Sequence, residues 1–135
     1  QSSLSRGIIS YDCYRDITAQ MLSFLPVELY PELILASFHL PNNDSNLDNF
    51  DWRKPDTGMF NYAIKKYKYD VKKSMMIGDK LTDLLPANNC KLSELFYISS
   101  PLHIEEKKKI EMWNFNNEEK IKIIKNLVYS EIYKN

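Results

Sequence analysis

The amino-acid sequence predicts an α/β domain built on a doubly wound, Rossmann-like parallel sheet. Three observations predict this fold class. Short apolar runs have the length and composition of buried parallel strands. Segments with apolar residues at helical spacing lie between these runs, so helices and strands alternate along the chain. The chain has 135 residues, the size of one ordinary domain, and no repeat or linker divides residues 1–135 into smaller parts.

The expected elements follow from apolar spacing and from the residues that begin and end helices. Ser10 is a good N-cap for the first helix, and Thr57 is a good N-cap for the second. Helices are expected at 11–25, 57–67, from about 82, and 117–133. Strands are expected at the apolar runs 33–39, 74–77, 95–98 and 110–115.

The composition is that of a globular protein without an overall charge bias. Apolar residues make up 44% and charged residues 27% of the chain, and 18 basic residues balance 18 acidic ones. This balance does not predict nucleic acid or an anionic membrane as a partner. Two cysteines, Cys13 and Cys90, are too few for a disulfide framework. We therefore expect a cytoplasmic protein that binds neither nucleic acid nor a membrane.

The glycines exclude one common ligand of this fold class. The chain contains only 3 glycines and no G-x-G-x-x-G segment. That segment lets the backbone approach the pyrophosphate of a dinucleotide. A dinucleotide site of the Rossmann type is therefore not expected.

A segment with two carboxylates follows the predicted strand at 74–77. In doubly wound sheets, ligands bind at the carboxyl ends of the strands. Gly78 is expected to let the backbone turn sharply, so that Asp79 projects from the strand end and Asp83 lies in the first turn of the next helix. Carboxylate oxygens are ligands that Mg²⁺ prefers when water and phosphate complete its shell. The spacing also fits a turn residue followed by an acidic helix N-terminus, so both interpretations stay open.

A cationic segment precedes the predicted helix at 57–67. Lys54 can hold a phosphate as a point charge, and Arg53 can hold one through two parallel hydrogen bonds. The helix N-terminus beyond them also favours an anion. By itself, the pair also fits two solvated cations in a loop.

The order of these segments resembles the haloacid dehalogenase (HAD) superfamily of phosphatases. More narrowly, it resembles the branch that holds heptose-bisphosphate phosphatase and histidinol-phosphate phosphatase. Three stretches carry the resemblance. Gln1–Gly7 is similar to the family's N-Q-S-G-I-x-R-G, Arg53–Met59 to its R-K-P-x-x-G-M, and Ile77–Asp83 to its V-G-D-K-x-x-D.

The resemblance implies a mechanism and a set of site residues. An aspartate attacks a phosphate monoester, water hydrolyses the resulting aspartyl-phosphate, and a second aspartate two residues on is the general acid and base. Asp79 would be a Mg²⁺ ligand with support from Asp83, and Lys54 would hold the phosphate beside the nucleophile. Four residues would contact the substrate, a small phosphorylated metabolite such as a heptose phosphate: Arg53, Lys80, Ser2 and Arg6.

The sequence departs from the family at the nucleophile. No D-x-D occurs anywhere in the 135 residues. We expect that motif upstream of Gln1, so that the chain resembles a HAD-type domain without its first two strands and without a large cap domain. Two functions stay open: a phosphatase whose nucleophile is not in this chain, and a catalytically inactive HAD-like binding module. A receiver domain fits less well, because it needs a lysine after a strand, whereas Lys54 precedes a helix.

Zinc is not expected. Many members of the branch hold Zn²⁺ with a C-x-H and a C-x-C pair, and the matching positions here are Ser37, His39, Phe50 and Trp52. One ligand of four cannot hold a structural zinc, so we expect aromatic side chains such as Trp52 to order this loop instead. Elemental analysis of protein purified without added metal should find no stoichiometric zinc. A zinc-to-protein ratio near one would overturn this interpretation.

Overall fold

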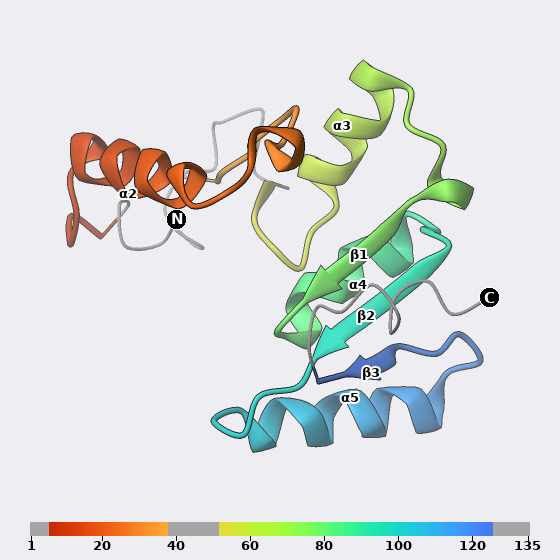
Figure 1. The fold of residues 1–135 in the computed structure, drawn as a ribbon. Coiled ribbons are helices and arrows are strands. Elements are labelled where there is room, and N and C mark those ends of the chain that lie inside the picture. Colours follow the sequence, from red (N-terminus) through yellow and green to blue (C-terminus); the bar gives the residue numbers. More distant parts are fainter. Residues whose placement is uncertain (1–5, 38–51, 126–135) are drawn as a thin grey trace. The chain divides into compact units, whose positions relative to one another are not determined.

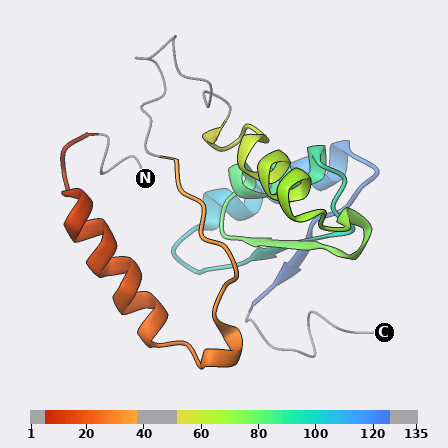
Figure 2. The same ribbon diagram turned by 90° about the horizontal axis from the view of Figure 1, so that it is seen from above.

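The computed structural model describes residues 6–37 and 52–125, which fall into two compact units. The first unit is Gln1–Arg53 and the second is Lys54–Asn135, and each is treated by itself. Figures 1 and 2 show the helices and strands of both units. Ser2, His39 and Phe50, and the part of the expected helix beyond residue 125, lie outside the described residues.

The first unit contains the predicted N-terminal helix. Helix α2 (Tyr11–Ser23) begins after Ser10, whose hydroxyl accepts the N–H of Cys13 at 3.1 Å. This confirms the predicted N-cap and helix. A short 3₁₀ helix, η1 (Val27–Leu29), follows Pro26.

The strand expected at 33–39 is wrong in its described part, because residues 33–37 form no strand. An apolar run predicts burial, but a strand also needs a neighbour that takes its backbone hydrogen bonds. None of the described strands pairs with these residues.

The second unit alternates helices and strands as the sequence predicts. Its elements are α3 (Gly58–Tyr67), η3 (Val71–Lys73), β1 (Met75–Gly78), α4 (Leu81–Asn89), β2 (Glu94–Ile98), α5 (Ile104–Asn116) and β3 (Lys122–Ile124). The strands form one sheet in the order β1-β2-β3, and both pairings are parallel (Figure 1). The unit is therefore an α/β fold with a parallel sheet.

The strand expected at 110–115 is wrong, because these residues belong to helix α5. Ile110 is fully buried in the core. The charged residues before it pair at helical spacing, Lys108 with Glu105 and Lys109 with Glu106. Residues three apart are neighbours on a helix and point to opposite faces of a strand. The charge pattern outweighs the short apolar run.

The helix expected at 117–133 is wrong in its described part, which contains strand β3. The side-chain amide of Asn114 donates to the carbonyl oxygen of Ile121 and accepts the N–H of Ile121, each at 2.8 Å. This side chain therefore takes the place of a backbone partner where the chain leaves α5. Ile121, just before the strand, and Ile124, its last residue, are both buried. A spacing of three residues suits a helix equally well.

One core holds the elements of the second unit together. Its buried residues come from α4, β2, α5 and the start of β3: Leu84, Ala87, Leu95, Tyr97, Ile110 and Ile121. Among the described strands, β1 pairs only with β2, so the opposite edge of β1 has no described strand beside it. None of the described helices is long and apolar enough to cross a membrane.

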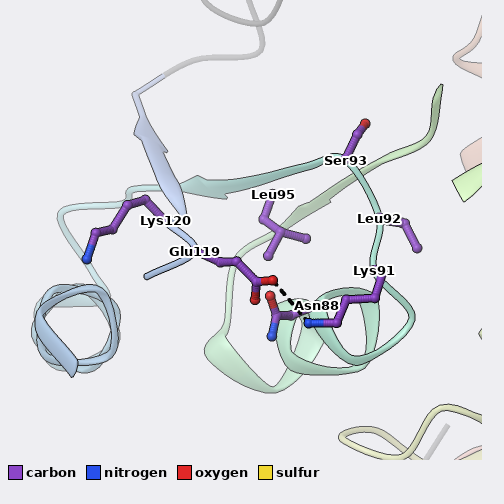
Figure 3. Close-up of a pocket in the computed structure, with 7 residues that line it drawn as sticks. All are labelled: Asn88, Lys91, Leu92, Ser93, Leu95, Glu119 and Lys120. Atoms are coloured by element: carbon purple, nitrogen blue, oxygen red, sulfur yellow. Dashed lines mark hydrogen bonds and ion pairs between the residues drawn. The ribbon is translucent and has the colours of Figure 1, made fainter. Parts of the chain in front are cut away.

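Helix α4 ends in a Schellman motif with a lysine in the left-handed position. Lys91 has φ 61°. Its N–H donates to Asn88 at 2.9 Å, and the N–H of Leu92 donates to Ala87 at 3.1 Å. The left-handed conformation favours glycine, because a Cβ there is strained. The Lys91 ammonium pairs with Glu119 at 3.0 Å across the pocket shown in Figure 3.

We expect Lys91→Gly to be more stable than Lys91→Ala by about 1 kcal/mol. Both variants lose the exposed pair with Glu119, so their difference isolates the strain of a Cβ at this position. Urea unfolding followed by circular dichroism measures it. Equal midpoints for the two variants would contradict the expectation.

Candidate active site

The end of strand β1 leads directly into the segment with two carboxylates. The strand ends at Gly78, Asp79 and Lys80 are exposed, and α4 begins at Leu81. Lys80 has extended backbone angles, and its carbonyl accepts the N–H of Asp83 at 3.0 Å. Asp79 and Lys80 therefore lie at the carboxyl end of β1, where ligands bind in sheets of this kind.

An ion pair connects the two segments that the sequence singles out. The ammonium of Lys54 lies 2.6 Å from Oδ1 of Asp83. Asp83 is 7% exposed, whereas the Lys54 side chain is 45% exposed. A buried carboxylate is costly without a partner, so this lysine is held at the start of α4 with part of its surface still open to a ligand.

Gly78 makes this arrangement possible through its size. The chain bends at Asp79 and Lys80, directly after Gly78. Gly78 does not use a left-handed conformation there, because the described glycine with positive φ is Gly7. A Cβ at Gly78 would lie 2.7 Å from Cβ of Asp83 and 3.3 Å from its Oδ2. The absent side chain therefore lets Asp83 pack against the end of β1.

Sequence reasoning missed a third carboxylate beside this segment. Glu106 of α5 accepts the N–H of Leu81 through Oε2 at 3.2 Å and the ammonium of Lys109 through Oε1 at 2.5 Å. The hydrogen bond from Lys109 lowers the pKa of Glu106. Leu81 N–H and the charges of Lys109 and Lys80 act in the same direction, against the effect of burial. No local signal marks Glu106 in the sequence, because it stands in a run of charged residues.

Tyr97 lies buried at the end of β2, beside the same carboxylates. Its hydroxyl donates to the carbonyl of His103 at 3.4 Å. Burial raises the pKa of Tyr97, and the negative charges of Glu106 and Asp79 raise it further. The carboxyl ends of β1 and β2 thus share one polar region.

The remaining predicted residues belong to other parts of the chain. Arg53 is the last residue of the first unit and is half-buried. Arg6 is exposed in a turn before α2, and Ser2 lies outside the described residues. The structure thus joins Lys54 to Asp83, and Asp79 and Lys80 lie close to Asp83 in the chain. The predicted substrate contacts of Arg53, Arg6 and Ser2 stay predictions.

The donor set suits a hard cation only in part. Within the described ranges, no three His, Cys, Asp or Glu side chains form a group that could hold a metal. Asp79 offers exposed carboxylate oxygens, and Mg²⁺ commonly takes one or two carboxylates together with water and substrate phosphate. Asp79 therefore fits as one ligand of such an ion. The pocket of Figure 3 is a different place, since Ser93 and Leu95 line it where β2 begins.

Comparisons with known proteins find similarity to one superfamily. The HAD-hydrolase-like family model matches residues 51–106, which include both segments. The D-glycero-beta-D-manno-heptose-1,7-bisphosphate 7-phosphatase of Haemophilus ducreyi is 35% identical over 91 residues, 64% of this chain and 50% of that protein. Residues 51–106 are therefore similar to HAD-type hydrolases.

Other relatives point to the same branch of the HAD superfamily. The protein of the same name from Pasteurella multocida is 29% identical over 109 residues, 78% of this chain and 59% of that protein. The histidine biosynthesis bifunctional protein HisB of Buchnera aphidicola is 42% identical over 50 residues, 37% of this chain and 14% of that protein. The chain spans about half the length of the curated heptose-bisphosphate phosphatases it matches first. No solved structure gives a significant match.

We expect Lys54→Met to destabilise this chain by about 1–3 kcal/mol, because it leaves the buried Asp83 carboxylate without its cation. Adding Asp83→Asn to Lys54→Met should recover much of the loss, since the amide carries no charge. Lys107→Met is the matched control. Lys107 is 47% exposed, close to Lys54, but its partner Glu111 is 55% exposed, so the control should cost less than ~1 kcal/mol. Urea unfolding compares the variants, and equal losses for Lys54→Met and Lys107→Met would contradict the expectation.

Proposed function

We propose that this chain carries the phosphate-binding and metal-binding part of a phosphatase that hydrolyses a phosphate monoester of a small metabolite, a sugar phosphate of the heptose class. The observation that carries the proposal is the 2.6 Å pair between Lys54 and Asp83. It joins the cationic segment to the segment with two carboxylates at the carboxyl end of β1. The names of the relatives from Haemophilus ducreyi and Pasteurella multocida support the substrate class.

Each site residue has a role that follows from its charge and place. Asp83 positions Lys54, whose half-exposed ammonium faces a phosphoryl oxygen and stabilises negative charge there. Asp79 is a Mg²⁺ ligand, and the bound ion neutralises phosphoryl oxygens. Lys80, at the N-cap of α4, contacts the substrate, as Arg53, Arg6 and Ser2 do in the same proposal.

The nucleophile comes from outside the 135 residues. Its carboxylate attacks phosphorus and displaces the sugar oxygen, which leaves as the alcohol with a proton from the general acid. Water then cleaves the aspartyl-phosphate and releases inorganic phosphate. The chain contains no D-x-D, and the edge of β1 away from β2 has no described strand beside it. A strand added at that edge would present its last residues at the same end of the sheet as Asp79.

The absence of a D-x-D motif also favours a second candidate function. A HAD-like module without the nucleophile binds a phosphorylated ligand through Lys54, Lys80 and Asp79 and leaves it intact. The two functions share the ligand chemistry and differ in turnover, so a measurement of turnover separates them.

We expect the 135-residue chain to leave p-nitrophenyl phosphate intact, and a chain extended by a strand with D-x-D-G-T to hydrolyse it when Mg²⁺ is present. In the extended chain, Asp79→Asn should lower turnover by orders of magnitude, because it removes a charged metal ligand. The matched control is Asp70→Asn. Asp70 is exposed and caps η3 through its side-chain oxygen, which asparagine supplies equally well, so turnover should stay near that of the unchanged extended chain.

Two outcomes decide against parts of this proposal. Near-normal turnover in Asp79→Asn would refute the metal ligand. An extended chain that binds inorganic phosphate at Lys80 but never hydrolyses the ester would support the inactive module instead.

A further inference from the structure

We propose that Glu106 is a positioning residue for the candidate site: its carboxylate holds the Asp79–Lys80 loop from outside the loop, through the N–H of Leu81. The inference deepens the proposed function, on which its effect on ligands rests. Its structural part stands on the contacts of the second unit alone.

The geometry gives Glu106 a place that no other described carboxylate has. It is on the first turns of α5, yet its Oε2 lies 3.2 Å from the backbone nitrogen of Leu81, the first residue of α4. The first N–H groups of a helix have no partner inside the helix. Lys80 at the N-cap makes no side-chain capping bond. Glu106 therefore caps α4 in place of a residue of α4 itself.

This cap fixes the residues just before it. Asp79 and Lys80 are the only residues between the end of β1 at Gly78 and the capped N–H of Leu81. Gly78 is held by the sheet, through its pairing opposite Tyr97 of β2. The two site residues thus lie between two fixed points, one supplied by β2 and the other by α5.

The cap also brings a negative charge to this end of the helix. Helix N-termini attract anions, and here the side chain of Glu106 occupies the N–H of Leu81. The charge of Lys80 acts on Glu106, and the charges of Glu106 and Asp79 both act on Tyr97. A cation at Asp79 therefore gains from Glu106, whereas a phosphate cannot use the N–H of Leu81.

Glu105 is a matched comparison on the same helix. Glu105 and Glu106 each pair with a lysine three residues later, at 2.9 Å and 2.5 Å. The Glu105 side chain is 78% exposed and that of Glu106 is 20% exposed. Of the two, only Glu106 has a described contact with α4. Substitutions at Glu105 thus report the loss of a helix charge without loss of the cap.

The experiment compares Glu106→Ala, Glu106→Gln and Glu105→Gln in the 135-residue chain by NMR. Amide hydrogen exchange of Leu81 measures the cap. It should be at least about tenfold faster in Glu106→Ala and close to the unchanged chain in Glu106→Gln, because the glutamine oxygen still accepts the hydrogen bond. Titration with MgCl₂, followed at the amides of Asp79 and Lys80, measures the charge. The affinity of the chain for Mg²⁺ should fall about two- to fivefold in Glu106→Gln and stay unchanged in Glu105→Gln.

Each outcome decides the proposal. If the amide exchange of Leu81 is unchanged in Glu106→Ala, Glu106 does not cap α4. If Glu106→Gln and Glu105→Gln lose the same Mg²⁺ affinity, the loss comes from the net charge of the chain and not from the position of Glu106. If Glu106→Ala does not fold, while Glu106→Gln folds with a protected Leu81 amide and weakened Mg²⁺ binding, the proposal holds. If the unchanged chain shows no Mg²⁺ response at Asp79, the metal part of the proposed function fails, and the exchange result still decides the role of Glu106.

Discussion

The candidate site depends on one buried charge, the carboxylate of Asp83. Its desolvation is offset by Lys54 at 2.6 Å, and that single contact ties the segment before α3 to the first turn of α4. The contact needs room, which the missing side chain of Gly78 provides at the end of β1. Glycine, aspartate and lysine at these positions therefore form one packing unit. Changing any one of them alters the surroundings of the other two.

The parts of the fold that could be predicted are those with local causes. β1, α4 and β2 are bounded by turn residues and have short apolar runs, so the sequence indicates them within a residue or two. The region after α5 could not be predicted, because buried isoleucines three apart fit both a helix and a short strand. The strand there is decided by its pairing with β2 and by the two hydrogen bonds between Asn114 and Ile121, one donated by each residue. Neither interaction leaves a periodic signal in the sequence.

The candidate site also has a part that the sequence indicates and a part that it does not. Spacing along the chain picks out Lys54, Asp79 and Asp83, because metal and phosphate chemistry requires charges at strand ends and helix starts. The sequence predicts that Gly78 serves a turn, but it does not predict that Asp83 packs closely against Gly78. Such a close approach between two elements cannot be read from the sequence of one of them. Spacing misses Glu106, because the contact with Leu81 joins the starts of two helices and nothing in a run of charged residues distinguishes the one that reaches across.

The charges of the site explain why a divalent cation belongs to the proposed function. Asp83 is paired with Lys54 and Glu106 with Lys109. Among the described residues, Asp79 and Lys80 have no ion pair within 4.0 Å, although the charge of Lys80 acts on Glu106. A phosphate monoester brings up to two further negative charges to this region. Lys54 is already shared with a buried carboxylate, and the N–H of Leu81 is taken by Glu106. In the proposed function, the described side chains alone would leave the ester under-neutralised, and a Mg²⁺ ion on Asp79 would restore the balance.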